Sequence, residues 1–456
     1  MNIKDDILIS KINRGYLVGG AVRDFLMYGA VPFDKDIAIK NAEAFSRELA
    51  EKFDGTIVVL DDENKIFRVV LKDKLNYFDI SELQGNSIEE DLLRRDFTIN
   101  AIAYDLESEK FIDTIGGRND IENKVIKHIK DENFTDDPLR ILRAFRFASV
   151  TGFEIDKKTF EAVIKYKKLL LKPSKERISY ELMKLFGGKS SSEVLLKTDE
   201  CGVLELIFPV MKEVKKVPPN SHHHLDLLHH SIEAVRNIEI LYREAPDEVK
   251  SHLDMVDFGG FPRINHLKLA GLLHDIGKPS TWTIEEDTGR HRFIKHDDLG
   301  AKMSVPVLKE LKFSKKQIEY ISKMIKTHIY PSNVISSPDL NEKVMMRYLR
   351  KMENDVIDNI ILAKADRLSA RGVEITPEIV ENNINGLDKL LNFYLDKKDS
   401  LKPLPKLLDG IEIMELKGIK QSPALGEIIS ALKEAQISGD VNTKEEAKEF
   451  VTEYKL

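Results

Sequence analysis

Hydrophobic and polar positions divide the chain into a mixed first part and a helical remainder. Up to about residue 125, short apolar runs typical of strands alternate with segments of helical periodicity, the clearest of which spans residues 42–53. Helical periodicity dominates the rest of the chain, for example at 150–187 and 267–273. The expected strands are residues 16–18, 37–39, 55–60, 66–71 and 76–80. We therefore predict an α+β protein in which a mixed sheet with helices is followed by mostly α-helical modules.

A glycine pair interrupts the pattern at the end of the first predicted strand. Gly19 and Gly20 follow the apolar run 16–18, and a helix is expected from Ala21, with Arg23 in its first turn. Two glycines between a strand and a helix allow backbone N–H groups to approach a phosphate, and a helix N-terminus favours an anion. A Gly-Gly pair alone is more often an ordinary turn, so its neighbours in the sequence decide between the two interpretations.

Asp34 and Asp36 stand at the start of the next apolar run, two positions apart. Side chains with this spacing on a strand point to the same face, where two carboxylates repel each other unless a cation lies between them. Hard oxygen ligands of this kind suit Mg²⁺ together with a triphosphate. Asp79, in the apolar run 76–80, is a candidate third carboxylate, and Glu82 is the alternative.

Composition is that of a globular protein with several modules. The 456 residues are too many for one ordinary hydrophobic core, so three or four modules are expected. They are 42% hydrophobic and 32% charged, with a net charge of −7. No apolar run approaches the length of a membrane span. The single cysteine, Cys201, agrees with a reducing cytoplasm, and its apolar neighbours predict that its thiol is buried. The lysine-rich segment 157–177 is either a solvated helix face or an RNA-facing surface.

The motifs of the first half resemble those of the class II tRNA nucleotidyltransferase and bacterial poly(A) polymerase family. The order is the family's order, although Asp136 stands where the family pattern Glu-Asp-x-x-Arg has Glu. The motifs are Leu-Val-Gly-Gly-Ala-Val-Arg-Asp (17–24), Asp-Lys-Asp (34–36), Arg-Arg-Asp-Phe-Thr-Ile-Asn-Ala (94–101), Asp-Asp-Pro-Leu-Arg (136–140) and Glu-Arg-Ile-Ser-Tyr-Glu (176–181). The resemblance implies a polymerase-β-type head that uses Mg²⁺.

The resemblance also assigns roles to individual residues of the head. It implies that Asp34, Asp36 and Asp79 are catalytic, and it favours Asp79 over Glu82 because the family's third carboxylate lies on an equivalent strand. The implied nucleotide-binding residues are Gly20, Arg23, Arg95, Asp96, Asp137, Arg140, Arg143 and Arg146. Among them, Arg95 would contact phosphate and Asp96 a ribose hydroxyl.

Residues 136–148 are predicted to form a helix with Pro138 in its first turn. The resemblance assigns Asp137 and Arg140 to the base of the incoming nucleotide. An aspartate accepts from the exocyclic amine of cytosine or adenine, an arginine donates to the neighbouring ring nitrogen, and uracil and guanine present the opposite groups. Arg177 and Glu181 are expected to form a structural i, i+4 pair.

A second constellation of histidines and aspartates follows Pro218 and Pro219 and resembles the HD-domain metal phosphohydrolases. This resemblance implies His230, rather than His229, and places His222–His224 at the surface. The implied ligands of divalent transition metals are His230, His274, Asp275 and Asp366, with His296 and His328 as extra ligands. In some tRNA nucleotidyltransferases this domain hydrolyses cyclic or terminal phosphates; an inactive site of the same fold is the alternative.

We therefore expect four modules: a head (1–135), a helical neck (136–215), an HD domain (216–400) and a helical tail (401–456) whose start is marked by Pro403 and Pro405. The turn and helix from Lys417 are either an RNA-facing element or a simple cap. The expected function is template-independent addition of C or A, from CTP or ATP, to tRNA 3′ ends in the cytoplasm. A-adding or poly(A) polymerase activity, or an HD phosphohydrolase with a vestigial head, are the alternatives.

Overall fold

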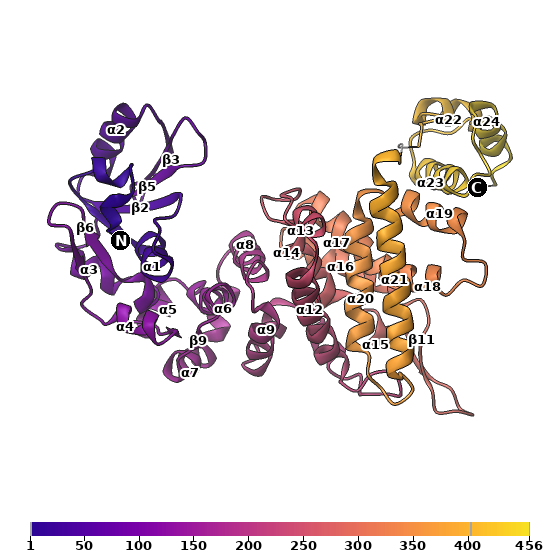
Figure 1. The fold of residues 1–456 in the computed structure, drawn as a ribbon, viewed down its shortest axis with the longest axis horizontal. Coiled ribbons are helices and arrows are strands. Elements are labelled where there is room, and N and C mark those ends of the chain that lie inside the picture. Colours follow the sequence, from indigo (N-terminus) through magenta and orange to yellow (C-terminus); the bar gives the residue numbers. More distant parts are fainter. Residues whose placement is uncertain (1, 402–403, 456) are drawn as a thin grey trace. The chain divides into compact units, whose positions relative to one another are not determined.

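The computed structural model describes residues 2–401 and 404–455, so Pro403, one of the two prolines used to place the last boundary, lies outside the described residues. The chain forms two compact units, Met1–Pro209 and Val210–Leu456, which are described separately; Figure 1 labels their elements. The expected class is confirmed, because a mixed sheet with helices precedes a helical remainder. The four-module division stays a prediction.

The first unit contains the large sheet and the helices that surround it. Its strands are β1 (Tyr16–Val18), β2 (Asp34–Ile39), β3 (Thr56–Asp61), β4 (Ile66–Val70), β5 (Tyr77–Glu82), β6 (Ala103–Asp105), β7 (Lys110–Ile112), β8 (Val125–Ile126) and β9 (Glu154–Ile155). Its α-helices are α1 (Gly19–Tyr28), α2 (Ala42–Phe53), α3 (Ile88–Leu93), α4 (Gly117–Glu122), α5 (Glu132–Asp136), α6 (Arg140–Thr151), α7 (Lys157–Tyr166), α8 (Lys175–Phe186), α9 (Ser191–Glu200) and α10 (Val203–Ile207).

The sheet places the two candidate metal-binding strands side by side. Its strand order is β3-β4-β5-β2-β1-β6-β7, and β2 and β5 pair in parallel. In this register Asp36 lies opposite Asp79. The adjacent residues of β2, Ile37 and Ala38, are fully buried, so both faces of the strand pack in the core, and Asp34 and Asp36 share one face because they are two residues apart.

Helix α1 begins two residues earlier than predicted, at Gly19 instead of Ala21. Gly19 has φ +64°, a conformation that residues with a β-carbon rarely adopt. An added β-carbon would lie 3.1 Å from Asp36 Oδ2 and 3.2 Å from Arg95 Nη1. The backbone conformation therefore favours glycine here, and a β-carbon would in addition require small shifts of two candidate site residues.

The prediction of one helix over 136–148 is wrong. Helix α5 ends at Asp136, Asp137 is extended with φ −136° and ψ 96°, and α6 begins at Arg140. The reason is Pro138, whose ring disfavours the helical conformation in the residue before it. Asp137 consequently lies in a break between two helices, and Pro138 is not part of a first turn.

Among its described residues, the second unit is helical apart from a hairpin of β10 (Trp282–Ile284) and β11 (His291–Phe293). Its α-helices are α11 (Met211–Val214), α12 (Leu227–Glu244), α13 (Asp247–Leu253), α14 (Arg263–Leu273), α15 (Lys278–Thr281), α16 (His296–Glu310), α17 (Lys315–Thr327), α18 (Tyr330–Ile335), α19 (Glu342–Met352), α20 (Val356–Ser369), α21 (Pro377–Lys397), α22 (Gly410–Lys417), α23 (Pro423–Ser438) and α24 (Lys444–Glu453). None of the helices in the described part of the chain has the length and apolar character needed to cross a bilayer.

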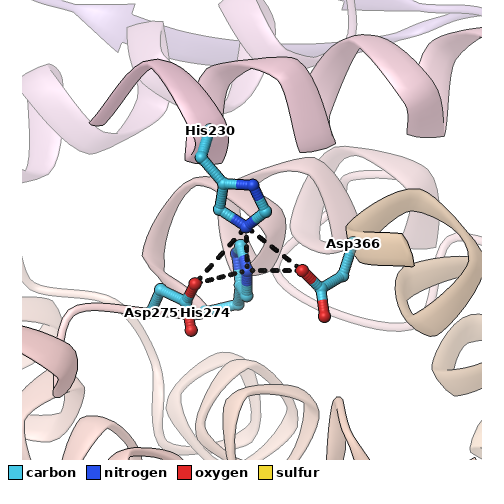
Figure 2. A group of neighbouring side chains, drawn as sticks. All are labelled: His230, His274, Asp275 and Asp366. Atoms are coloured by element: carbon cyan, nitrogen blue, oxygen red, sulfur yellow. Dashed lines mark hydrogen bonds and ion pairs between the residues drawn. The ribbon is translucent and has the colours of Figure 1, made fainter. Parts of the chain in front are cut away.

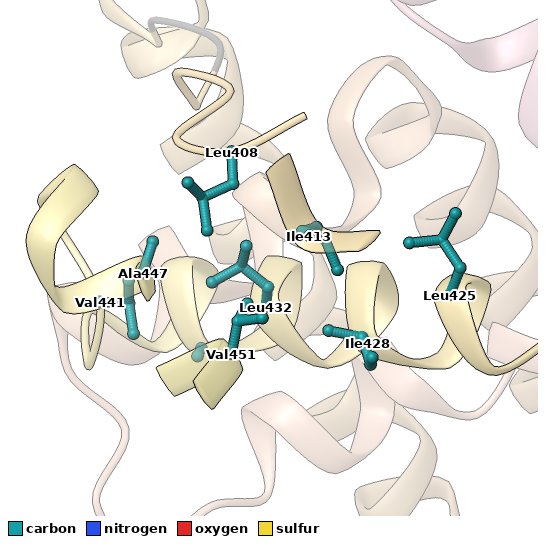
Figure 3. Close-up of a cluster of buried hydrophobic side chains, with 9 residues drawn as sticks. Leu408, Ile413, Leu425, Ile428, Leu432, Val441, Ala447 and Val451 are labelled. Atoms are coloured by element: carbon teal, nitrogen blue, oxygen red, sulfur yellow. The ribbon is translucent and has the colours of Figure 1, made fainter. Parts of the chain in front are cut away.

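The last three helices pack around a hydrophobic cluster of their own. Leu408 and Ile413 meet side chains of α23 and α24, among them Ile428 and Val451, which are fully buried (Figure 3).

In the first unit, Cys201 is buried as predicted, and burial raises the pKa of its thiol to about 11. A thiol in this state is a structural residue and a poor nucleophile.

Candidate active site and metal centre

A cavity of 710 Å³ in the first unit brings together the residues that the sequence assigned to nucleotide chemistry. The turn from β1 to α1, strands β2 and β5, the segment after α3, and helices α6 and α8 all contribute side chains to it. The predicted residues that line it are Gly20, Arg23, Asp34, Asp36, Asp79, Arg95, Asp96, Asp137, Arg140, Arg143 and Arg146. Segments far apart in the sequence thus converge on one space of a size suited to a small ligand.

Three carboxylates form the acidic part of the cavity. Asp34, Asp36 and Asp79 each offer an oxygen, and these oxygens lie within 4.8 Å of one another. Oδ1 of Asp34 is buried without a hydrogen-bond partner among the described residues. Glu82, the alternative third carboxylate, instead accepts hydrogen bonds from the backbone N–H groups of Asn41 and Ala42 at the start of α2. An unpartnered oxygen among three clustered carboxylates fits a Mg²⁺ site.

The electrostatics of this cluster are unfavourable without a cation. Burial, followed by repulsion from Asp34, raises the pKa of Asp36 to about 7. Burial and Asp79 likewise raise the pKa of Asp34. Such shifts mean that folding holds carboxylates together that would separate in the unfolded chain, where their pKa values are near 4.

A stability measurement tests this repulsion. Since the folded state holds the Asp36 proton up to about pH 7, metal-free protein should lose stability as the pH rises through the window between about 4 and 7. In a chelator at about pH 8, Asp36→Asn should therefore melt at a higher temperature than the wild type, and the difference should shrink towards about pH 5. Adding Mg²⁺ at the higher pH should stabilise the wild type more than the variant. Lower stability of Asp36→Asn in chelator, compared with an exposed Asp62→Asn control, would contradict the proposed repulsion.

Arginines form the cationic part of the cavity, and neighbouring side chains hold them in place. Arg23 donates from Nη1 to Asn100 Oδ1 at 2.8 Å, and Arg95 donates to Asp91 Oδ2 at 3.0 and 3.2 Å. The guanidinium carbons of Arg23, Arg143 and Arg146 lie 4.0–5.3 Å from the ring centroid of Phe147. These cations are therefore fixed in place before any anion binds, which lowers the entropy lost on binding.

Asp96 supports one of these arginines directly. Arg143 donates to its Oδ2 from both Nε and Nη2, at 2.8 and 2.5 Å, and Asn100 donates to its Oδ1 at 2.9 Å. Burial alone would raise the pKa of Asp96, but Arg143 and these hydrogen bonds hold it well below its usual range. Asp96 lines the cavity as a permanently charged group whose oxygens already have partners.

Asp137 and Arg140, the predicted base-selecting residues, both line the cavity. The predicted ion pair between Arg177 and Glu181, however, is not formed. Arg177 instead donates from Nη2 to Asp137 Oδ2 at 2.9 Å. Glu181 pairs with Arg146 at 3.1 Å and with Arg143 at 3.6 Å. The i, i+4 expectation is wrong because α6 packs beside α8 and offers partners that local sequence spacing does not reveal.

The second unit contains the histidine and aspartate constellation (Figure 2). His230 of α12, His274 and Asp275 after α14, and Asp366 of α20 point toward one another. His230 Nε2 lies 3.1 Å from Asp366 Oδ1, and His274 Nε2 lies 3.1 Å from Asp275 Oδ2. His229, the alternative, bonds Asp226 near the surface instead. The four predicted ligands are thus brought together.

A second ligand group shares Asp275. Its Oδ1 lies 3.3 Å from His296 Nε2 and 3.7 Å from His328 Nε2. The Nδ1 atoms of His274, His296 and His328 lie 2.7–2.8 Å from backbone carbonyl oxygens. A carbonyl oxygen only accepts, so Nδ1 carries a proton in each ring, and Nε2 is the atom that faces the centre and can bind a metal.

Both oxygens of Asp275 are buried without a hydrogen-bond partner among the described residues, although Lys278 forms an ion pair with Oδ2 at 2.6 Å. A carboxylate between two groups of imidazole lone pairs fits a pair of divalent cations that share one ligand. The chemistry of the donor set therefore agrees with a two-metal centre.

The expectation that His222–His224 lie at the surface is wrong for His223. Its ring centroid lies 4.3 Å from that of His230, its Nε2 lies 3.2 Å from Lys278 Nζ, and burial lowers its pKa to about 2. Because the segment before α12 has no periodic pattern, only the tertiary structure shows that this ring packs against a candidate ligand. His224 is exposed as expected.

Three residues near the head cavity were not singled out for these roles in the sequence. Lys184 of α8 lines the cavity, Arg177 binds Asp137, and Arg68 of β4 binds Asp79. Arg68 gave the clearest signal, since a charged residue inside the apolar run Ile-Phe-Arg-Val-Val requires a partner.

Comparison with protein families finds three successive matches. Residues 15–127 match the poly A polymerase head domain, residues 152–215 the probable RNA and SrmB-binding site of polymerase A, and residues 227–371 the HD domain. Solved structures share the fold. A CCA-adding enzyme of Bacillus stearothermophilus in complex with CTP is 22% identical with a TM-score of 0.57, over 96% of this chain and 92% of that one. A CCA-adding enzyme of Thermotoga maritima complexed with tRNA is 24% identical with a TM-score of 0.54, over 96% and 90%.

Curated relatives match over nearly their whole length. An A-adding tRNA nucleotidyltransferase of Deinococcus radiodurans is 32% identical over 95% of this chain and 94% of the relative. A CC-adding tRNA nucleotidyltransferase of Thermus thermophilus is 30% identical over 95% and 92%. Together with the head cavity, these matches show that the chain belongs to the class II tRNA nucleotidyltransferase and bacterial poly(A) polymerase family.

Proposed function

We propose that this protein adds C, A or both from CTP and ATP to the 3′ end of tRNA and releases pyrophosphate. The observation that carries the proposal is the single cavity in which the carboxylates Asp34, Asp36 and Asp79 face a set of fixed arginines and the pair Asp137 and Arg140. Relatives with A-adding, CC-adding and CCA-adding names all match the chain, which supports the reaction class.

The three carboxylates would hold Mg²⁺, which when bound neutralises charge on the triphosphate and activates the 3′-hydroxyl for in-line attack on the α-phosphate. The chain's own groups orient the triphosphate. The backbone at Gly20 and the side chains of Arg23 and Arg95 lie where they can bind phosphate oxygens, the first at the start of a helix. Asp96 acts by holding Arg143 toward the cavity instead of contacting the ribose, because its oxygens are already occupied.

Base selection would rest on Asp137 and Arg140. The aspartate accepts from the exocyclic amine of C or A and the arginine donates to the ring nitrogen, whereas U and G present a carbonyl and an N–H at these positions. Two contacts of the structure support this assignment. Arg177 holds the Asp137 carboxylate, and Arg140 donates from Nη1 to the carbonyl oxygen of Asn133 at 3.2 Å, so both groups have a defined orientation.

A second activity, metal-dependent phosphohydrolysis, is proposed for the second unit. The observation that favours it is the inward orientation of the Nε2 atoms around the buried carboxylate of Asp275. Divalent transition metals held there would lower the pKa of a bound water and allow hydroxide to attack phosphorus. The substrates expected are cyclic or terminal phosphate esters.

Sequencing of reaction products tests the first proposal. Three tRNA substrates that lack the whole CCA end, the last two nucleotides or only the terminal A are incubated with all four nucleoside triphosphates. We expect only C or A at the extended ends, and the substrates that are extended identify CCA, CC-only or A-only addition. A long A tail would identify a poly(A) polymerase, and incorporation of U or G would refute base selection by Asp137 and Arg140.

A further inference from the structure

Arg68 occupies a particular place beside the three carboxylates. It lies on β4 directly opposite Asp79 of β5 in the antiparallel register. Its Nε donates to Asp79 Oδ1 and its Nη2 to Asp79 Oδ2, both at 2.7 Å. The guanidinium carbon lies 4.1 Å from the ring centroid of Tyr77, which supports the fork from one side. A planar, two-point contact of this kind fixes both the rotamer and the plane of a carboxylate.

The contact distinguishes Asp79 from the other two carboxylates. Asp34 has a buried carboxylate oxygen without a hydrogen-bond partner in the described structure. Asp79, by contrast, forms an ion pair with Arg68, whose Nη2 lies 2.7 Å from Asp79 Oδ2. Asp79 is therefore the one member of the trio that is held by a cation of the protein itself.

Arg68 is not one of the described residues that line the cavity, whereas Asp79 is. Its two side-chain hydrogen bonds reach the cavity through Asp79. Each carboxylate oxygen keeps a second lone pair after accepting one hydrogen bond, so the arginine leaves Asp79 able to coordinate a cation.

We propose that Arg68 is a positioning residue that orients the Asp79 carboxylate toward Asp34 and Asp36 and so completes the metal-binding trio. The proposal rests on the proposed nucleotide addition at this cavity. It differs from two other roles for the same contact: a simple charge balance, which any cation at position 68 would provide, and a plug that would have to leave before a metal could bind.

Arg68→Lys is the most informative variant, because it keeps the charge and removes the fork; Arg68→Gln removes both. We expect both variants to lower kcat for nucleotide addition about 10- to 100-fold at saturating Mg²⁺, since residues that orient metal ligands contribute effects of that size. The KM for the nucleoside triphosphate should change by less than about threefold, because the phosphate and base contacts are untouched. Binding of Mn²⁺ alone, followed by electron paramagnetic resonance without nucleotide, should weaken about 10-fold in Arg68→Lys.

Arg47→Lys is the matched control, since Arg47 forms an exposed pair with Glu43 on α2 of the same unit. It should leave kcat and Mn²⁺ binding unchanged. Near wild-type kcat in Arg68→Lys would overturn the proposal in favour of charge balance, and tighter Mn²⁺ binding with undiminished kcat in Arg68→Gln would overturn it in favour of a plug.

A double-mutant cycle distinguishes an effect of Arg68 on Asp79 from a general folding defect. In an Asp79→Asn background, Arg68→Lys should cause no further loss of single-turnover rate, because the residue acts only through Asp79. An additional loss there, or a parallel rise in the triphosphate KM, would indicate general disruption and overturn the proposal. If Asp36→Ala retains full nucleotide addition, the proposed function itself fails; if Asp36→Ala is inactive and Arg68→Lys is normal, only the role of Arg68 fails.

Discussion

Asp36→Ala is expected to reduce the incorporation of label from radioactive CTP or ATP into tRNA by about 10³-fold or more. The variant removes the carboxylate at the centre of the trio, opposite Asp79 in the sheet, and with it a ligand for a cation whose stabilisation of the transition state amounts to several kcal/mol. The loss should appear in kcat with every tRNA substrate that the wild type extends, because every addition uses the same carboxylates.

Asp62→Ala provides the matched control for this prediction. Asp62 carries the same charge in the same unit but is exposed at the turn of the β3–β4 hairpin, where it pairs with Lys65. Its removal should leave the incorporation rate unchanged. Label that entered tRNA at an undiminished rate with Asp36→Ala would show that the chemistry takes place elsewhere.

His274→Ala is expected to lower the rate of metal-dependent hydrolysis of cyclic or terminal phosphate esters by about 100-fold or more, while nucleotide addition persists. His274 is fully buried and its Nε2 faces His230, Asp275 and Asp366, so the variant removes one ligand from the centre of the proposed metal group. Asp36→Ala should show the reverse pattern. Phosphatase assays with added Mn²⁺ or Ni²⁺ and measurement of bound metal by elemental analysis provide the two readouts.

The exposed His224 gives the control for the second unit, and His224→Ala should hydrolyse substrate like the wild type. Metal bound at wild-type stoichiometry in His274→Ala would contradict the ligand assignment. Full metal loading of the wild type without any hydrolysis would instead leave a metal centre of structural function and refute the second activity.

Much of the head could be predicted because its chemistry lies in contiguous motifs. The strand 16–18 and the helix 42–53 have the predicted bounds, and the two-residue spacing of Asp34 and Asp36 on β2 places their side chains on one face. The convergence of Asp34, Asp36 and Asp79 followed from spacing and resemblance together. In the second unit, the apolar helix before His274 made the buried ligands recognisable in the same way.

Partner choice was the part that the sequence could not provide. Arg177 lies one turn from Glu181 on α8 but binds Asp137, because the break at Pro138 turns that carboxylate toward α8. Arg68 meets Asp79 only through the register of β4 against β5. These contacts depend on how elements pack, which no local propensity encodes, and they connect groups 11 or 40 residues apart.

Because Gly19 has no β-carbon, a side chain of the acidic part and a side chain of the cationic part of the head cavity can both lie close to its backbone. A methyl group there would press on Asp36 and on Arg95 at once, one a candidate ligand of the cation and the other of the anion. A substitution at position 36 that alters the metal preference, or one at position 95 that alters the triphosphate contact, must therefore fit into the space next to Gly19. The residue that constrains such a redesign most is therefore one that offers no side chain to alter.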